Sequence, residues 1–212
     1  MLKLHGFAVS NYYNAVKHYL LDKGIDFEEV PAVPSQDPSF LAVSPLGKVP
    51  VLEVETGTLT ETNVILEYLE VLYPEPPRYP TDPFDYAKSK QLFKTIELYV
   101  EAPAHRMLGV LFGREVPDAV QQECKGQMER GLEGVRRLAR MTPYLCGDQL
   151  TAVDLFALYA FKLSNSVTRK LFSWDLIAEV PGLNAVLDEL QASPVGQRVL
   201  TENKAALKAM QG

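Results

Sequence analysis

The sequence predicts a small α/β domain followed by an all-helical domain. Up to about residue 73, short strand patterns alternate with helical patterns, whereas no strand pattern follows residue 83. Between them, residues 74–83 (PEPPRYPTDP) hold five prolines in ten positions, which is typical of an extended, semi-rigid linker. We therefore expect a domain at 1–73, a linker at 74–83 and a second domain at 84–212.

The first domain is predicted to contain seven elements in the order βαβαββα. Gly24 stands where a helix C-cap is expected, and Thr56-Gly57 separates two short strand patterns in the way a hairpin turn does. Apolar residues recur at helical spacing at Ile65, Leu69 and Leu72. Strands are expected at 2–5, 26–30, 51–54 and 58–60, and helices at 12–23, 37–42 and 64–73. This order predicts a small mixed sheet with helices on its faces.

The second domain is predicted to be helical throughout. Pro103 lies inside its first helix and should kink it, because proline has no N–H and its ring clashes with the preceding turn. Thr151 precedes Asp154 by three residues, which is a variant of the capping box. The segment after it is apolar nearly all round and should be the buried central helix. Helices are expected at 84–112, 117–141, 155–163, 183–190 and 195–210.

Composition argues against several classes of function. A formal net charge of -6 disfavours a nucleic-acid partner, and the longest apolar segment, 155–163, is too short to cross a membrane. The N-terminus lacks an apolar core of signal-peptide length. Cys124 and Cys146 are isolated, so neither a disulfide scaffold nor a metal site is indicated. We expect a cytoplasmic protein without a bound metal, whose two thiols are packed or partly exposed.

The most informative stretch is 44–63, SPLGKVPVLEVETGTLTETN. It combines a loop, two short strand patterns and the start of a helix. Strand edges and helix N-termini both offer unpaired backbone groups, which an amino-acid-like ligand can satisfy. The stretch therefore fits a site for a small peptide.

This stretch also resembles the glutathione-binding half of the cytosolic glutathione S-transferases. In that family a turn of the form Pro-x-Gly-x-Val-Pro is followed by Glu or Gln and then by Ser or Thr. The matching positions here are Pro45, Gly47, Val49, Pro50, Glu61 and Thr62. The segment 147–154, GDQLTAVD, and the two-part layout are also similar to the family, so the resemblance spans essentially the whole chain.

The resemblance implies a thioredoxin-like fold for the first domain and glutathione as co-substrate. It points to a bacterial, serine-type or theta-like member that conjugates the glutathione thiolate to small hydrophobic electrophiles in detoxification. It also implies a homodimer, with the helices at 84–112 and 117–141 at its interface. Two alternatives stay open: a glutathione-dependent isomerase or dehalogenase, and a non-catalytic binding protein of the same family.

Thiol activation is assigned to the turn between the first strand and the first helix. Family members that use serine place it at this turn, where Ser10 stands; on the residues alone, Ser10 is equally an ordinary N-cap. The residues that follow depart from the family pattern, so Asn11 is a second candidate through its side-chain amide. The hydroxyl of Tyr12 or Tyr13 is a third, because other classes of the family use tyrosine.

The resemblance implies roles for five residues of the peptide-binding stretch. Pro50 would follow a cis peptide bond, Val49 would bind the cysteinyl part through its backbone, and Lys48 would approach the glycyl carboxylate. Glu61 would accept from the γ-glutamyl ammonium group, and Thr62 would bind the γ-glutamyl carboxylate at a helix N-terminus. On the residues alone, a solvated lysine and an ordinary helix start explain Lys48, Glu61 and Thr62 as well.

The electrophile pocket is the part that the sequence determines least. His105 and Arg106 would bind an anionic substrate or be solvated, and helical tyrosines are often core residues. The candidates from the first turn and the helices are Phe7, Ala8, Tyr99, His105, Arg106 and Tyr159.

Overall fold

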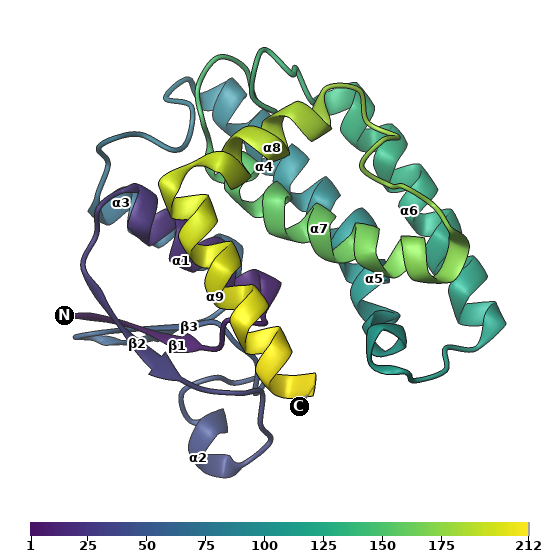
Figure 1. The fold of residues 1–212 in the computed structure, drawn as a ribbon. Helices are drawn as coiled ribbons and strands as arrows, with labels where there is room; N and C mark the ends of the chain where they lie inside the picture. The colour runs from purple at the N-terminus through teal and green to yellow at the C-terminus, as the bar shows by residue number, and fades with distance from the viewer. Residues whose placement is uncertain (212) are drawn as a thin grey trace. The chain divides into compact units, whose positions relative to one another are not determined.

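The structure, a computed structural model, describes residues 1–211 and separates into two compact units. The first unit combines Met1–Pro77 with the segment that begins at Gln191, and the second is Arg78–Leu190. Figure 1 shows the helices and strands of both units. The last helix thus groups with the N-terminal segment, an association between distant parts of the chain that no local sequence pattern signals.

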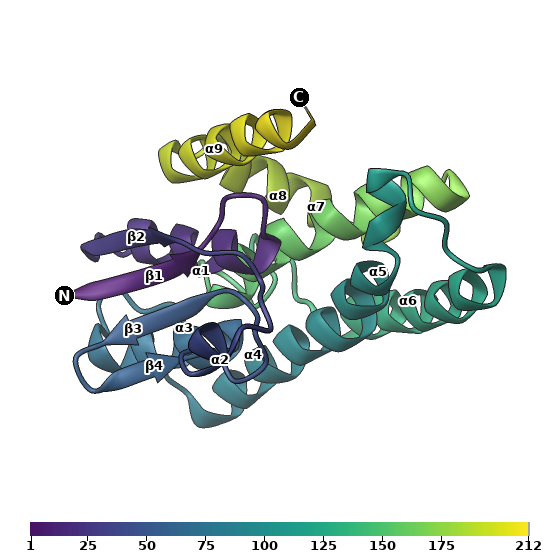
Figure 2. The ribbon, with the colours of Figure 1, turned by 90° about the horizontal axis from the view of Figure 1, so that it is seen from below.

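The first unit is built on a four-stranded mixed sheet with the strand order β2-β1-β3-β4. Its elements are β1 (Leu2–Gly6), α1 (Asn11–Asp22), β2 (Phe27–Pro31), α2 (Pro38–Leu41), β3 (Val51–Val54), β4 (Gly57–Leu59), α3 (Thr62–Leu72) and, from the far end of the chain, α9 (Pro194–Gln211). β1 pairs in parallel with β2 and antiparallel with β3, which pairs antiparallel with β4, as Figure 2 shows. The predicted order βαβαββα and the mixed sheet are confirmed.

β1 lies at the centre of the core of this unit. Its side chains alternate between buried and half-buried, as the two-residue period of a strand requires. Leu4 on β1 and Leu52 on β3 are opposite each other in the register, and both are fully buried. α1 and α3 pack together on one face of the sheet (Figure 1) and bury Tyr19, Ile65 and Leu69 completely.

Two buried lysines anchor α1 to its neighbours. The ammonium group of Lys23, at the C-cap of α1, lies 2.6 Å from a carboxylate oxygen of Glu70 on α3. Lys17 is only 2% exposed, and its ammonium group binds Glu29 on β2 at 2.6 Å and Glu202 on α9. A buried charge is tolerated only when it is paired and hydrogen-bonded. The packing of α1 against β2, α3 and α9 therefore depends on these three carboxylates.

The second unit consists of helices, which confirms the predicted all-helical region. Its elements are α4 (Pro83–Ile96), the π-helical turn η1 (Glu97–Glu101), α5 (Ala102–Arg106), the 3₁₀ turn η2 (Leu108–Phe112), α6 (Asp118–Leu138), α7 (Ala152–Phe172) and most of α8 (Leu183–Ala192). The single helix predicted at 84–112, with a kink at Pro103, is wrong, because four segments share that range. α7 extends well beyond the apolar segment 155–163 that predicted it. None of the helices formed by residues 1–211 combines the length and apolar character needed to cross a membrane.

Pro103 explains why the long predicted helix is divided. Since Pro103 has no N–H, the carbonyl of Tyr99, four residues earlier, loses its helical donor and meets the proline ring. The chain widens into the π turn η1 just before Pro103, where the N–H of Ala102 bonds the carbonyl of Glu97, five residues back. The sequence predicted a kink at this proline, and the structure resolves it as a change of helix type.

Helices α6 and α7 supply side-chain donors to the π turn. The amide of Gln127 on α6 donates to the carbonyl of Leu98 at 3.2 Å. The hydroxyl of Ser164 on α7 donates to the carbonyl of Val100 at 3.4 Å. These bonds satisfy backbone acceptors that the irregular helix geometry exposes.

The start of α7 carries the predicted capping box. The buried carboxylate of Asp154 accepts hydrogen bonds from the backbone N–H of Thr151 at 2.8 Å, from its hydroxyl at 2.7 Å and from the N–H of Leu145 at 2.7 Å. Burial raises the pKa of Asp154, and these hydrogen bonds oppose that rise. The carboxylate therefore fixes both the first turn of α7 and the loop before it.

Gly131→Ala is expected to destabilise the protein by about 2 kcal/mol, because the added Cβ would lie 2.4 Å from the carbonyl oxygen of Tyr99. Gly126→Ala on the same helix is the matched control. Its Cβ meets only the Arg130 guanidinium, at 3.7 Å, so it should stabilise α6 by about 0.5–1 kcal/mol. Urea unfolding of both variants measures the difference. A Gly131→Ala protein as stable as the parent would contradict the close approach of η1 and α6.

Candidate functional site

The strand register brings three segments of the chain to one end of the sheet. His5 of β1 is opposite Val51 of β3, so continuing that register by one residue puts Gly6 level with Pro50. Leu52 of β3 is opposite Leu59 of β4, and continuing this register by two residues puts Glu61 level with Pro50. The first turn, the Val-Pro step and the start of α3 therefore lie side by side.

The width of this end of the sheet matches a small peptide. Neighbouring strands lie about 4.8 Å apart, so β1 and β4, on either side of β3, are about 10 Å apart. An extended tripeptide spans about 10 Å. A tripeptide can therefore lie across the end of β3 with one terminus near Glu61, its middle residue at the Val49–Pro50 step, and the side chain of that middle residue reaching toward Ser10.

Ser10 caps the N-terminus of α1, as one of its two interpretations predicted. Its hydroxyl oxygen accepts from the backbone N–H of Tyr13 at 3.3 Å, and its own N–H donates to the carbonyl of Phe7 at 3.0 Å. Accepting this bond uses a lone pair of the hydroxyl and leaves its proton to donate. Capping and donation to a sulfur are therefore compatible in this geometry.

The placement of Tyr13 argues against its hydroxyl as the donor that activates the thiol. Its hydroxyl donates to Glu29 on β2 at 2.5 Å, and its ring packs on Gly6, where an added Cβ would lie 2.2 Å from a ring carbon. Burial and then the bond to Glu29 raise the pKa of Tyr13 well above its usual range. The Tyr13 hydroxyl is thus committed to the sheet. Asn11 is buried as the first residue of α1, and Tyr12 is half-buried beside it.

The loop before β3 is held by a residue that the sequence analysis missed. The hydroxyl of Ser44 donates to the carbonyl of Lys48 at 2.7 Å and accepts from its N–H at 2.9 Å. Gly47 has φ 65°, and an added Cβ there would lie 2.1 Å from the carbonyl oxygen of Ser35. The side chain of Lys48 is exposed, and the Val49–Pro50 bond that follows is cis, as predicted. A small polar residue in a loop gave no signal of the role of Ser44.

The start of α3 has the features of an anion site. Glu61 adopts φ 67° and ψ 114°, a conformation that non-glycine residues rarely take, and no side chain caps the helix. Thr62 is 3% exposed, and its buried hydroxyl has no hydrogen-bonding partner within the described chain. The N–H groups of a first helical turn point outward and favour negative charge. A ligand carboxylate would satisfy both these N–H groups and the hydroxyl.

Two of the residues predicted to bind the electrophile are paired with carboxylates of the second unit. His105 Nδ1 lies 2.8 Å from the buried carboxylate of Glu101, and the guanidinium of Arg106 lies 3.0 Å from that of Glu123. The hydrogen bond to Glu123 raises the pKa of Arg106. These contacts give both side chains a partner within the protein, without a substrate. Tyr99 is exposed on η1 and Tyr159 is buried in α7, while Phe7 and Ala8 lie in the first turn of the other unit.

Comparison with known proteins decides the family. Residues 4–77 match the family model described as glutathione S-transferase, N-terminal domain. A glutathione S-transferase of Pseudomonas putida is 42% identical over 210 residues, which cover 99% of this chain and 96% of that protein. The chain belongs to the glutathione S-transferase family. The predicted enzyme family is thereby confirmed.

Two further proteins match this chain over most of their length. A maleylacetoacetate isomerase of Pseudomonas aeruginosa is 27% identical over 208 residues, covering 92% of this chain and 97% of that protein. The crystal structure of a glutathione S-transferase from Methylobacterium radiotolerans, in complex with glutathione sulfonate, superposes with a TM-score of 0.77 at 25% identity. It covers 93% of each chain, and it confirms the predicted fold class.

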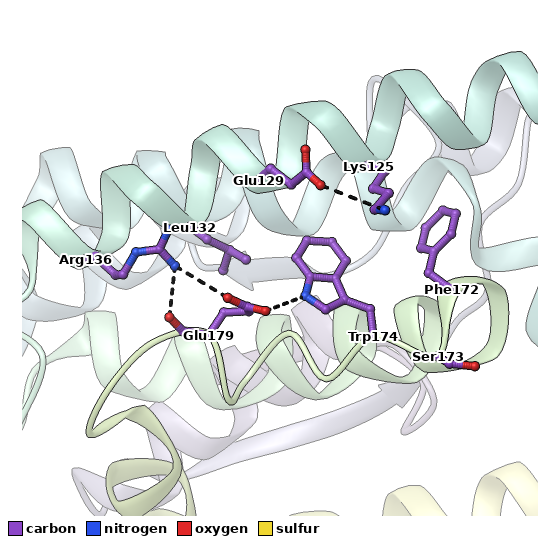
Figure 3. Close-up of a pocket in the computed structure, with 8 residues that line it drawn as sticks. All are labelled: Lys125, Glu129, Leu132, Arg136, Phe172, Ser173, Trp174 and Glu179. Carbon is purple, nitrogen blue, oxygen red and sulfur yellow. Dashed lines mark hydrogen bonds and ion pairs between the residues drawn. The ribbon is translucent and has the colours of Figure 1, made fainter.

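A pocket of about 370 Å³ lies on the second unit of this transferase (Figure 3). None of the residues that line it is a predicted site residue. Arg136 donates to the carbonyl of Glu179 at 2.9 Å, and the indole N–H of Trp174 donates to the Glu179 carboxylate at 3.0 Å. The ammonium group of Lys125 lies 4.0 Å from Glu129. These charges are therefore paired among themselves, and they join the segment after α7 to α6. The lining residues are Lys125, Glu129, Leu132, Arg136, Phe172, Ser173, Trp174 and Glu179.

Neither cysteine is built for catalysis. Cys124 is buried, and burial raises the pKa of its thiol. Burial likewise raises the pKa of Cys146 to about 12. A reactive thiol needs the opposite shift, because the thiolate is the nucleophile. Among residues 1–211, no group of three or more His, Cys, Asp or Glu side chains is arranged to hold a metal ion.

Thr62→Val is expected to leave the ligand-free protein as stable as the parent or up to about 1 kcal/mol more stable, because it removes a buried, unpaired hydroxyl. Thr151→Val is the matched control. The Thr151 hydroxyl donates to buried Asp154, so its loss should destabilise by about 1–3 kcal/mol. Urea unfolding without glutathione compares the two. Equal losses of stability in both variants would show that the Thr62 hydroxyl has a protein partner.

Proposed function

We propose that the protein binds glutathione across the end of β3 and transfers its thiolate to small hydrophobic electrophiles. The observation that carries this proposal is the register, which aligns the turn of Ser10, the Val49–Pro50 step and the start of α3 over about 10 Å. A glutathione molecule has an anionic end, a peptide backbone and a thiol. The three aligned segments offer a partner for each.

Each part of glutathione has a proposed partner. Thr62 and the first N–H groups of α3 bind the γ-glutamyl carboxylate, and Glu61 accepts from the adjacent ammonium group. The backbone of Val49, shaped by Pro50, pairs with the cysteinyl residue. Lys48 approaches the glycyl carboxylate from its exposed position. The buried, unpaired hydroxyl of Thr62 supports this arrangement, because a bound carboxylate would satisfy it.

We propose a serine-type mechanism. The free thiol has a pKa of about 8.5, and lowering it by about 2 units takes roughly 2.7 kcal/mol of preferential thiolate stabilisation. A donated hydrogen bond from the Ser10 hydroxyl and the N-terminus of α1 supply energy of that order. The thiolate then attacks the electrophilic carbon, a C–S bond forms, and a leaving group such as chloride departs with the bond electrons. Asn11 remains the alternative donor.

Ser10→Ala is expected to raise the apparent thiol pKa in the pH profile of kcat/KM by about 1–2 units, because the thiolate loses its donor. Turnover of a chloronitroaromatic acceptor below that pKa should fall by about 10- to 100-fold, while the Kd for glutathione changes little. Ser10→Thr keeps a hydroxyl and a cap, and it is the matched control for the lost capping bond. If instead only Asn11→Ala shifts the thiol pKa, the side-chain amide is the donor.

Glu61→Gln is expected to weaken glutathione binding by about 10- to 100-fold, since a charge-assisted hydrogen bond to the ammonium group is lost. Glu55→Gln, an exposed residue of the β3–β4 turn, is the matched control and should bind like the parent. Isothermal calorimetry measures both. Unchanged affinity in Glu61→Gln would remove Glu61 from the site, and no uptake of millimolar glutathione by the parent would overturn the proposal.

A second candidate function is glutathione-dependent isomerisation, which the similarity to the maleylacetoacetate isomerase of Pseudomonas aeruginosa favours. In that reaction the thiolate adds to a double bond, the resulting single bond rotates, and the thiolate leaves again. Counting glutathione separates the two functions. Conjugation consumes one glutathione per product, whereas isomerisation of maleylacetoacetate consumes none. Binding of glutathione without turnover of either substrate type would favour a non-catalytic member.

We further infer a cytoplasmic role in detoxification and a homodimer formed through the 84–112 and 117–141 regions. Leu98 and Tyr99, adjacent and exposed on η1, support an interface there, because neighbouring apolar side chains on a surface often mark one. Sedimentation equilibrium tests the assembly. A mass of one chain at micromolar concentration would exclude it.

A further inference from the structure

The carbonyl oxygen of Ala8, two residues before Ser10, accepts hydrogen bonds from two side-chain amides. One comes from Asn14 within α1, at 2.8 Å, and the other from Asn203 on α9, at 2.7 Å. A carbonyl oxygen has two lone pairs, so these two donors saturate it. The turn that carries Ser10 is therefore fixed both by its own helix and by a helix from the far end of the chain.

The neighbour of Asn203 fastens α9 to α1 independently. The carboxylate of Glu202 binds the buried ammonium group of Lys17, and it also accepts from Arg198, one turn earlier on α9, at 3.1 Å. Lys17 binds Glu29 as well, the residue that receives the Tyr13 hydroxyl. Figure 1 shows α9 running alongside α1. The Glu202–Lys17 ion pair therefore holds α9 against α1 without Asn203. The contribution of Asn203 is its hydrogen bond to the turn.

We propose that Asn203 is a positioning residue for thiol activation, which it serves by holding the Ala8 carbonyl and hence the orientation of the Ser10 hydroxyl. This inference rests on the proposed function, because the thiol in question is that of glutathione. Asn203 touches no reacting atom. A hydrogen bond to a thiolate depends steeply on distance and angle, so a looser turn stabilises the thiolate less. The last helix thereby belongs to the catalytic apparatus.

The test compares Asn203→Leu with Lys204→Ala. Leucine keeps the approximate size of asparagine and removes the amide, whereas Lys204 is the exposed neighbour on the same helix. In Asn203→Leu the apparent thiol pKa in the kcat/KM profile should rise, because less stabilisation leaves less thiolate at a given pH. Below that pKa, kcat/KM should fall about fivefold and recover at alkaline pH, with glutathione Kd unchanged. Lys204→Ala should match the parent throughout.

The pH profile separates positioning from mere structural support. A structural defect lowers activity equally at all pH values, whereas a positioning defect disappears where the thiol is ionised without help. In a Ser10→Ala background, Asn203→Leu should add no further shift of the thiol pKa, because both act through one hydroxyl. Additive shifts, or a uniform loss across pH, would overturn the inference.

The inference and the proposed function fail in different ways. If Ser10→Ala leaves the thiol pKa unchanged, the serine mechanism fails, and Asn203 loses its role with it. If Ser10→Ala shifts the pKa and Asn203→Leu does not, only the role of Asn203 fails. Hydrogen exchange of the Ser10 backbone amide, whose N–H bonds the Phe7 carbonyl, is a second measurement of the rigidity of the turn and needs no substrate. It should accelerate in Asn203→Leu, or in the milder Asn203→Ser if the leucine variant does not fold; unchanged exchange would contradict the inference.

Discussion

Pairing of β3 on both of its edges is the constraint on which the candidate site depends. β1 pairs with one edge and β4 with the other, both antiparallel. Because the register is shared, the carboxyl end of β1 meets the beginning of β3, and β4 returns the chain to the same level. A shift of one residue in the β1–β3 pairing would move Gly6 away from Pro50, and a shift of one residue in the β3–β4 pairing would move Glu61 away from both. The site is thus a property of the sheet rather than of any single motif.

Polar contacts then fix what the sheet brings together. The first turn depends on the amides of Asn14 and Asn203, the loop before β3 on Ser44, and the start of α3 on the unusual backbone of Glu61. Such bonds are directional, so they hold a geometry more sharply than apolar packing does. Ionic contacts of α1 add a second layer around the buried Lys17.

Features encoded by neighbouring residues were predictable from the sequence, and features that depend on distant residues were not. Strand alternation, the hairpin turn and the capping box of Thr151 and Asp154 are local, and the structure has all of them. The association of α9 with the first turn joins residues 195 positions apart, which no periodicity encodes. Pro103 predicted a disturbance, but the form it takes depends on donors from α6 and α7. The candidate ligand residues were identified by resemblance to a family. Their alignment at one end of the sheet became visible only from the strand register of the structure.

The central claim is that one tripeptide crosses β1, β3 and β4 with its sulfur at Ser10. A crystal structure with bound glutathione tests it most directly. The account predicts the sulfur within hydrogen-bonding distance of the Ser10 hydroxyl, the cysteinyl backbone against Val49, and the γ-glutamyl carboxylate on the Thr62 hydroxyl and N–H. A glutathione molecule bound elsewhere, or bound here with its sulfur turned away from the N-terminus of α1, would contradict it.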